Sequence, residues 1–262
     1  MSYESIDLKV SDGVAHVTLN KPEIGNPFNA VFCAEWLVLA HELSGRDDVR
    51  AVLIKAIGKF FSVGGDINLF AQTLDQLPSC IREWTGDLHM GIARLARLNA
   101  PIIAAIHATA MGGGVSLIAG CDLVYCARSA RLGSAYSQIG YSCDAGGSFA
   151  LASRMGIARA RRFVLLAEML SAEEAAQTGL VDFVVDDNAL MAEAEKAAVR
   201  LANGPTRAYG EIRRLFIKSL GQPFEAQLED EAQALSRAAG TEDAREGITA
   251  FVEKRKPQFR GR

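Results

Sequence analysis

The sequence predicts an α/β fold that ends in a run of helices, and three observations support this class. Short apolar runs rich in β-branched residues alternate with segments whose apolar residues recur every three or four positions. Glycine-containing turns separate many of these segments. After about residue 187 the strand-like runs stop, while the helical spacing continues. Strands that alternate with helices are typical of an α/β architecture with substantial parallel pairing.

The chain begins with a predicted hairpin. Residues 6–10 and 14–19 alternate apolar and polar side chains around Ser11-Asp12-Gly13, a sequence that favours a tight turn. Residues 29–44 then have the spacing of a helix. Residues 49–57 form an apolar, β-branched run, which is typical of a buried strand.

The middle of the chain repeats the order strand, glycine loop, helix. We expect a loop at 58–66, a helix at 81–98 and a buried strand at 101–108, followed by the glycines 112–114 and a helix. A strand at 122–127 and a helix beginning near Asp144 come next. A capping box from Ser171 to Glu174 then starts another helix, and a last strand is expected at 180–185.

Four consecutive helices are predicted after the last strand, at 187–204, 205–221, 222–240 and 241–256. We expect residues 1–196 to form the core and residues 197–262 to form a helical domain. The apolar faces of these helices need a surface to cover them, either the core or a neighbouring subunit.

Composition excludes several classes of function. The 262 residues carry a net charge of −3, so no general attraction to nucleic acid or to anionic lipid is expected. No apolar run approaches the roughly 20 residues of a membrane span, and the N-terminal residues lack a secretory pattern. The five cysteines form no CxxC pair and no ligand set with histidine, so we expect reduced thiols, a cytoplasmic location and no metal site.

Gly112, Gly113 and Gly114 stand directly before a predicted helix. Their spacing fits neither a dinucleotide fingerprint nor a phosphate-binding P-loop. Two interpretations remain, which are tight packing of a helix on a strand and an anion site made of backbone N–H groups. A second loop, Lys59–Ile67, also joins a strand to a helix through glycines. Two such loops can direct two N–H groups at one oxygen, as in an oxyanion hole.

Four segments of the chain resemble the crotonase, or enoyl-CoA hydratase/isomerase, superfamily. They are LNKPEIGNPFN, FFSVGGDI, the block from APIIAAIHATAMGGGVSLIAGCDLVYCA through YSQIGYSCDAGGS, and the ending REGITAFVEKRKPQF. The resemblance implies a spiral of ββα repeats with a C-terminal helical domain that assembles trimers or pairs of trimers. It also implies an acyl-CoA thioester substrate, with coenzyme A as part of the substrate and no permanently bound cofactor. By position, the N–H groups of Gly65 and Gly113 would stabilise the thioester oxygen.

The catalytic carboxylates of the family's hydratases are missing. Their two glutamate positions hold Ser116 and Tyr136, so we do not expect water addition by two carboxylates. Asp144 remains, and it matches by position the aspartate of ring-1,2-epoxyphenylacetyl-CoA isomerase, dienoyl-CoA isomerase and 4-chlorobenzoyl-CoA dehalogenase. The neighbouring pattern is closest to the first of these. A single carboxylate suits isomerisation, because one group can remove a proton and return it. The alternative is that Asp144 only caps the following helix.

His89 leaves a second chemistry open. It lies where the dehalogenase has its water-activating histidine, while Tyr136 replaces that enzyme's tryptophan. In that hypothesis Asp144 would be a nucleophile; otherwise His89 is a helix residue packed against the acyl pocket. A hydratase or a thioesterase on the same scaffold is a further alternative. A non-catalytic or RNA-binding member of the family is an alternative of another class.

The residues predicted to bind coenzyme A are chosen for their positive charge or from the resemblance. Lys21, Lys59 and the basic tail at 254–262 suit its phosphates, although solvated surface lysines explain them equally well. Ile24 and Val63 match positions that frame the adenine pocket in relatives. Asp66 and Ile67 follow the glycines of the same loop and complete the predicted binding residues.

Overall fold

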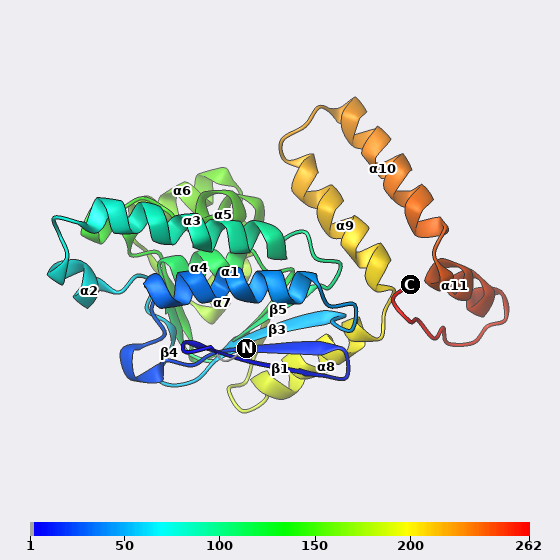
Figure 1. Ribbon diagram of the computed structural model, residues 1–262, viewed down its shortest axis with the longest axis horizontal. Coiled ribbons are helices and arrows are strands. Elements are labelled where there is room, and N and C mark those ends of the chain that lie inside the picture. Colours follow the sequence, from blue (N-terminus) through cyan, green and yellow to red (C-terminus); the bar gives the residue numbers. More distant parts are fainter. Residues whose placement is uncertain (1–2) are drawn as a thin grey trace.

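The computed structural model describes residues 3–262 and places their strands in two sheets (Figure 1). The larger sheet has the order β1-β2-β3-β5-β7-β10 and the smaller one the order β4-β6-β8-β9. The strands are β1 (Ile6–Ser11), β2 (Val14–Leu19), β3 (Ala51–Ala56), β4 (Phe60–Ser62), β5 (Ile102–Ile106), β6 (Thr109–Met111), β7 (Leu123–Ala127), β8 (Arg131–Gly133), β9 (Met169–Ser171) and β10 (Phe183–Val185).

Consecutive strands divide between the two sheets. β3, β5 and β7 are parallel neighbours in the larger sheet, whereas the strands that follow them, β4, β6 and β8, are parallel neighbours in the smaller sheet. Helical segments come after each second strand. The chain therefore winds as a spiral of ββα units, which confirms the predicted α/β class.

Helices cover both faces of the larger sheet. α1 (Ala30–Ser44) packs against α3 (Leu77–Leu95) on one side, and α8 (Leu190–Ala202) packs on β2, β3, β5 and β7 from the other (Figure 1). The central strands are consequently buried on both faces, which explains why β5 is apolar throughout. The remaining helical segments of the core are η1 (Pro22–Ile24), α2 (Ile67–Gln72), α4 (Gly113–Ala119), η2 (Tyr136–Ile139), α5 (Gly147–Met155), α6 (Ile157–Leu165) and α7 (Ala172–Gln177).

Local signals account for several of these boundaries. Asp12 and Gly13 both have positive φ, as the tight turn of the first hairpin requires. Ser171 and Glu174 form the predicted capping box at the start of α7. Asn29 caps α1 by accepting the N–H of Phe32.

The last three helices extend to one side of the core (Figure 1). They are α9 (Thr206–Ser219), α10 (Phe224–Ala239) and α11 (Glu242–Val252). The buried guanidinium of Arg213 fixes α9 to the core, because it donates to the Asp122 carboxylate at 2.7 Å and to the Leu98 carbonyl at 2.5 Å. The predicted boundary after residue 196 falls within α8, and the division into two domains stays a prediction.

Several predicted boundaries were wrong. The helix expected at 81–98 is α3, which begins at Leu77 and ends at Leu95, and the loop expected at 58–66 contains β4. Pro78 explains the earlier start, since proline favours the first turn of a helix. The strands of the smaller sheet are only three residues long, which is too short for a periodic pattern.

The helices that the structure describes are all too short or too polar to cross a membrane.

Candidate active site

A cavity of about 900 Å³ lies between the start of α3 and the glycine loops. Its lining is mainly apolar and comes from three regions, which are the loop and helices at 63–89, the glycines after β6, and the segment 134–144. Among the described residues that line this cavity, Asp144 is the one that carries a carboxylate. The cavity therefore brings together every residue that the sequence predicted as catalytic, Gly65, His89, Gly113, Tyr136 and Asp144.

The two glycine loops touch each other at this cavity. Gly64 has a φ of +78°, and a Cβ added there would lie 3.3 Å from the backbone nitrogen of Gly113. The bridge between Phe28 and Gly65 uses the Gly64 carbonyl and the Asp66 N–H, so the N–H of Gly65 points away from that bridge. Gly113 is the first residue of α4, where a backbone N–H has no partner within the helix.

Each glycine of the triplet has its own steric reason. Gly112 has a φ of +49°, which places the chain in the left-handed region before α4. A Cβ on Gly113 would lie 2.9 Å from the Phe28 ring, and a Cβ on Gly114 would lie 2.8 Å from Cβ of Ser62. Tight packing of a helix on a strand thus accounts for Gly114, whereas Gly112 and Gly113 line the cavity.

Asp144 points its carboxylate at this part of the wall. Its Oδ1 lies 3.1 Å from where a Cβ on Gly113 would stand. The interpretation of Asp144 as a helix cap is wrong, since α5 begins at Gly147, its N-cap residue is Gly146, and no side chain caps it. The carboxylate instead accepts the hydroxyl of Tyr136 at 2.5 Å.

Ser116, Tyr136 and Asp144 form a chain of hydrogen bonds. The Tyr136 hydroxyl donates to Asp144, so it accepts from the Ser116 hydroxyl, which lies 2.8 Å away and is fully buried. Ser116 in turn requires a glycine at position 147, because a Cβ there would come within 2.1 Å of Oγ. Ser116 and Tyr136 therefore hold the Asp144 carboxylate through one continuous chain of hydrogen bonds.

Burial sets the acidity of these groups. It raises the pKa of Asp144 above its ordinary value, and this effect outweighs the hydrogen bond from Tyr136, which favours the anion. Burial and the neighbouring Asp144 carboxylate raise the pKa of the Tyr136 hydroxyl. Tyr136 is therefore a hydrogen-bond donor at neutral pH, whereas burial makes the Asp144 carboxylate easier to protonate than an ordinary aspartate.

An aromatic cluster stands beside the cavity, and two of its three rings, Phe70 and Tyr141, line it. The Phe70 ring lies between Trp84 and Tyr141, with ring centroids 6.2 and 5.9 Å away. A Cβ on Gly65 would lie 2.8 Å from the same ring, so the cluster begins beside the first glycine loop. Phe70, Tyr141 and several aliphatic side chains give the cavity an apolar surface.

The predicted coenzyme A residues divide into two groups. Val63 and Ile67 line the cavity. Asp66 accepts the N–H of Leu69 and so caps α2. Asp66 lies outside the lining, as do the other three: Lys21 forms an ion pair with Glu4 at 2.9 Å, Lys59 lies 5.4 Å from the centre of the Phe60 ring, and Ile24 is half exposed.

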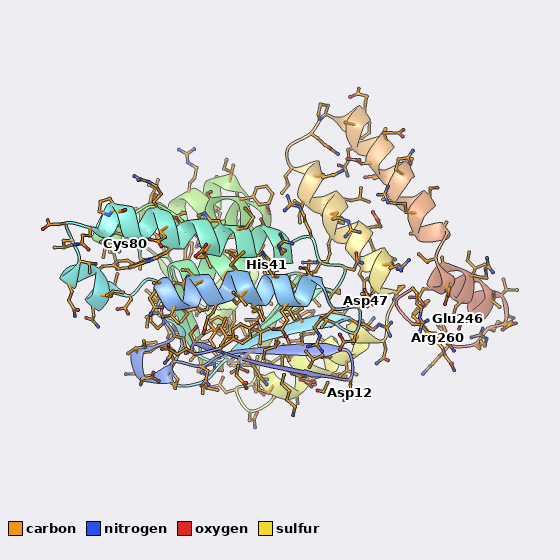
Figure 2. The ribbon with its side chains drawn as sticks, in the orientation of Figure 1. Asp12, His41, Asp47, Cys80, Glu246 and Arg260 are labelled. Carbon is orange, nitrogen blue, oxygen red and sulfur yellow. The ribbon has the colours of Figure 1, made fainter. Side chains whose placement is uncertain are left out.

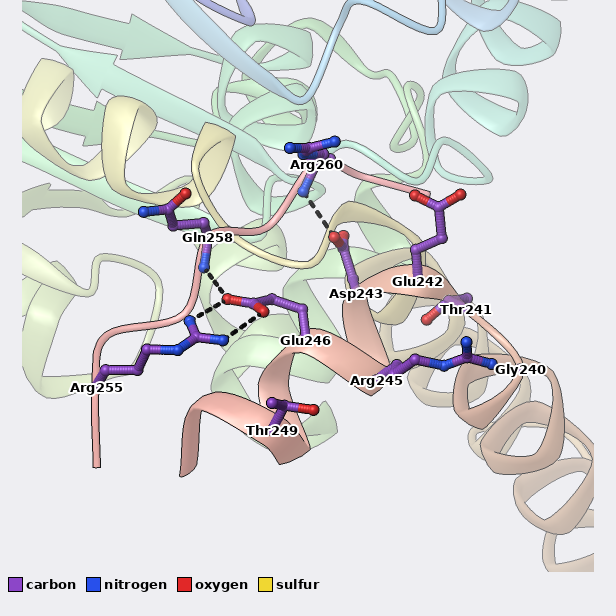
Figure 3. Close-up of a pocket in the computed structure, with 10 residues that line it drawn as sticks. All are labelled: Gly240, Thr241, Glu242, Asp243, Arg245, Glu246, Thr249, Arg255, Gln258 and Arg260. Carbon is purple, nitrogen blue, oxygen red and sulfur yellow. Dashed lines mark hydrogen bonds and ion pairs between the residues drawn. The ribbon is translucent and has the colours of Figure 1, made fainter. Parts of the chain in front are cut away.

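The basic tail lies elsewhere, in a polar pocket beside α11 (Figure 3). Arg255 makes a two-pronged ion pair with Glu246 at 2.6 and 2.9 Å, and Glu246 also accepts the N–H of Gln258. Asp243 is buried and accepts the N–H groups of Arg260 and Gly261. Figure 2 shows Glu246 and Arg260 at the opposite end of the molecule from Cys80, which stands near the start of α3. Within one copy, the tail thus lies far from the cavity.

Known proteins match the chain along its whole length. The family model described as enoyl-CoA hydratase/isomerase matches residues 9–262. A protein of Rhodobacter capsulatus named as a probable enoyl-CoA hydratase is 35% identical over 262 residues, covering 100% of both chains. The 1,2-epoxyphenylacetyl-CoA isomerase of Escherichia coli K12 is 34% identical over 259 residues, covering 97% of each chain. The crystal structure of an enoyl-CoA hydratase from Polaromonas has a TM-score of 0.91 at 28% identity, covering 97% of this chain and 99% of that one.

The fold is therefore that of a crotonase with a C-terminal helical region. The chain belongs to the enoyl-CoA hydratase/isomerase family and is an enzyme of that family. The names of its relatives include both hydratases and isomerases, so the family fixes the class of enzyme and of substrate but leaves the reaction open.

Three features of the site were not predicted from the sequence. They are the bond between Ser116 and Tyr136, the aromatic cluster around Phe70, and a hydrogen bond from the N–H of Ala145 to His89 at 3.0 Å. Each joins segments that are distant in sequence, and neither periodicity nor motif spacing records such contacts. A weak signal existed for two of its rings, because Phe70 follows the first glycine motif closely and Tyr141 closely precedes Asp144.

Proposed function

We propose that this enzyme isomerises an enoyl-CoA thioester with Asp144 as its acid and base. The Asp144 carboxylate removes a proton from a carbon of the acyl chain, and the electron pair of that C–H bond moves onto the thioester oxygen to give an enolate. The N–H groups of Gly65 and Gly113 stabilise the oxygen anion. Asp144 then returns the proton to another carbon, which shifts the double bond without consuming water.

One observation carries this proposal. The carboxylate of Asp144 stands alone among the described cavity-lining residues and lies beside the first N–H of α4. Water addition in the manner of a two-glutamate hydratase has no second carboxylate here, since Ser116 and Tyr136 are bonded to each other and to Asp144. One base beside an oxyanion site is sufficient for moving a proton between two carbons.

The acidity of Asp144 supports the same assignment. A general base works best when its pKa approaches the working pH, and burial moves the pKa of Asp144 in that direction. The hydrogen bond from Tyr136 occupies Oδ1, which leaves Oδ2 as the oxygen that exchanges the proton. The Tyr136 hydroxyl thereby orients the base and does not compete with it.

The lining of the cavity supports an apolar acyl group. Phe70 and Tyr141 offer ring surfaces beside the first glycine loop, which suits aromatic or alicyclic acyl groups as well as aliphatic ones. This agrees with the motif-level likeness to ring-1,2-epoxyphenylacetyl-CoA isomerase. Lys21, Ile24, Lys59, Val63, Asp66 and Ile67 remain the proposed coenzyme A residues.

Asp144→Asn tests the proposed reaction. Asparagine keeps the shape and can still accept the Tyr136 hydroxyl, but it cannot take a proton. We expect kcat for 3-enoyl-CoA isomerisation to fall by about 10²–10⁴-fold. The wild-type enzyme in D₂O is expected to place deuterium in the product or to exchange a substrate proton.

Two other outcomes would overturn the isomerase. A covalent adduct on the Asp144 peptide, found by mass spectrometry after quenching turnover of an aryl-CoA, would show that Asp144 is a nucleophile. Unchanged isomerase activity in a folded Asp144→Asn protein would remove the catalytic role altogether. Assays of hydration and thioester hydrolysis on the same panel would identify either of those reactions.

The helical extension is proposed to assemble the enzyme. α9, α10 and α11 expose large apolar side chains, among them Phe216, Phe224, Leu235 and Phe251 at 71–85% exposure. Faces of this kind are typical of subunit contacts. We expect trimers, or pairs of trimers, in light scattering. A stable monomer of about 28 kDa at micromolar concentration would contradict this.

A further inference from the structure

The segment that carries Asp144 has an unusual backbone. Ala145 is buried and has a φ of +49°, a conformation that residues with a Cβ seldom adopt, and Gly146 follows with a φ of +74°. Such conformations persist only where the surroundings enforce them. A buried N–H in this position also needs an acceptor.

That acceptor is the imidazole of His89. The N–H of Ala145 donates to Nε2 at 3.0 Å, across a separation of 56 residues. Nε2 must therefore carry its lone pair, so the imidazole is neutral and its proton is on Nδ1. The side chain projects from α3, whose 19 residues pack along α1. His89 thus anchors the segment after Asp144 to a long helix of the core.

We propose that His89 is a positioning residue for Asp144 and not a base. The bond from Ala145 fixes the backbone that leaves Asp144, while Tyr136 holds Oδ1 of the carboxylate. Two contacts from different elements therefore set the direction of one carboxylate beside Gly113. The lone pair that a water-activating histidine would use at Nε2 is already occupied. This inference rests on the proposed function, because it assigns His89 a role in placing the proposed base.

Two substitutions separate positioning from base catalysis. His89→Gln places an amide oxygen near the position of Nε2, so it keeps an acceptor but removes the imidazole. His89→Leu removes both. His41→Leu is the matched control, because His41 is an exposed histidine on α1. Steady-state kcat and KM for 3-enoyl-CoA isomerisation, and amide hydrogen exchange at Ala145 without substrate, are measured for all three and for the wild type.

We expect His89→Leu to lower kcat by about 10²-fold with little change in KM, since a small misplacement of a catalytic group costs about that much. Exchange at Ala145 should become faster in the same variant. His89→Gln should retain most of both properties, and His41→Leu should resemble the wild type. Loss of activity in His89→Gln equal to that in His89→Leu, with Ala145 still protected, would show that the imidazole is itself the base.

The exchange measurement keeps this inference separate from the proposed function. If wild-type and Asp144→Asn proteins show equal isomerase activity, the proposed function fails. Faster exchange at Ala145 in His89→Leu alone would still support the anchoring of this segment. Unchanged exchange and unchanged kcat in His89→Leu, beside an inactive Asp144→Asn, would overturn the role of His89 and leave the isomerase intact.

Discussion

Two carboxylates in different pockets of the molecule, Asp144 and Glu246, have opposite surroundings. Glu246 meets the guanidinium of Arg255 and the N–H of Gln258, and these partners lower its pKa to about 2 (Figure 3). Asp144 faces an apolar cavity with a tyrosine hydroxyl as its side-chain donor, and burial raises its pKa. Glu246 is thus a fixed anion that holds the C-terminal tail against α11.

The contrast separates a structural acid from a chemical one. A carboxylate with a guanidinium partner gains little from protonation, because the ion pair would be lost. A carboxylate that has been moved out of water without a full ionic partner is close to exchanging its proton. The density of charged residues is high at the C-terminal tail, but Arg255 and Glu246 there are paired with each other. No cationic side chain among the described residues is bonded to Asp144, and this lack of a partner distinguishes the candidate site.

The largest effect is expected from removing the backbone N–H of Gly113, which lies beside Asp144. Gly113→Pro removes one N–H, and proline is tolerated at the first position of a helix. We expect kcat to fall by about 10²–10³-fold, the usual cost of losing one oxyanion donor. Thioester binding, measured by calorimetry, should be partly retained because Gly113 is not among the proposed coenzyme A residues.

Gly113→Ala is the steric control for that experiment. Both variants add a Cβ near the Phe28 ring and Asp144, but alanine keeps the N–H. Equal turnover in the two folded variants would mean that crowding, and not a lost hydrogen bond, causes the defect.

Tyr136→Phe is expected to have a smaller effect. The hydroxyl favours the anionic form of Asp144, so its removal should move the acid limb of the pH–kcat profile to higher pH. We expect kcat to fall by about tenfold, because losing a hydrogen bond to a charged group costs roughly 1.5 kcal/mol. Tyr141→Phe removes a hydroxyl from the same cavity and should leave the acid limb in place. An acid limb unmoved in Tyr136→Phe would show that a group other than Asp144 titrates there.

The sequence was sufficient for the fold class, and the five residues that it predicted as catalytic all line one cavity. Long periodic segments such as α1 and the buried run of β5 were predicted because burial fixes their pattern. The glycine loops were informative because a close backbone approach excludes side chains. The short strands of the smaller sheet were missed, since three residues are too few for a pattern.

The partners of those residues could not be predicted. The bonds from Tyr136 to Asp144 and from Ala145 to His89 depend on how η2 and α3 meet the segment before α5. The sequence does not indicate which group a hydroxyl will bond to. Ser116 and Tyr136 therefore indicated only that two glutamates expected from the resemblance were missing. Their positive role, which is holding the remaining carboxylate, follows from tertiary packing.

The smallest expected effect concerns stability. It tests whether folding shifts the pKa values of the two carboxylates in opposite directions. Folding raises the pKa of Asp144, so burying the ionised carboxylate destabilises the folded protein. This destabilisation is absent below the pKa of about 3.9 in the unfolded chain and is complete above the pKa in the folded protein. Asp144→Asn should therefore melt a few degrees higher than the wild type at pH 8, with the gain vanishing near pH 3.5. Folding lowers the pKa of Glu246, so its contribution is present above the unfolded value and disappears as the pH falls toward 2. Glu246→Gln should accordingly melt lower than the wild type at pH 8 and approach it in acid. A lower melting temperature for Asp144→Asn at pH 8, measured by calorimetry, would show that the charge on Asp144 is compensated in the folded state and that the contrast between the two sites is not electrostatic.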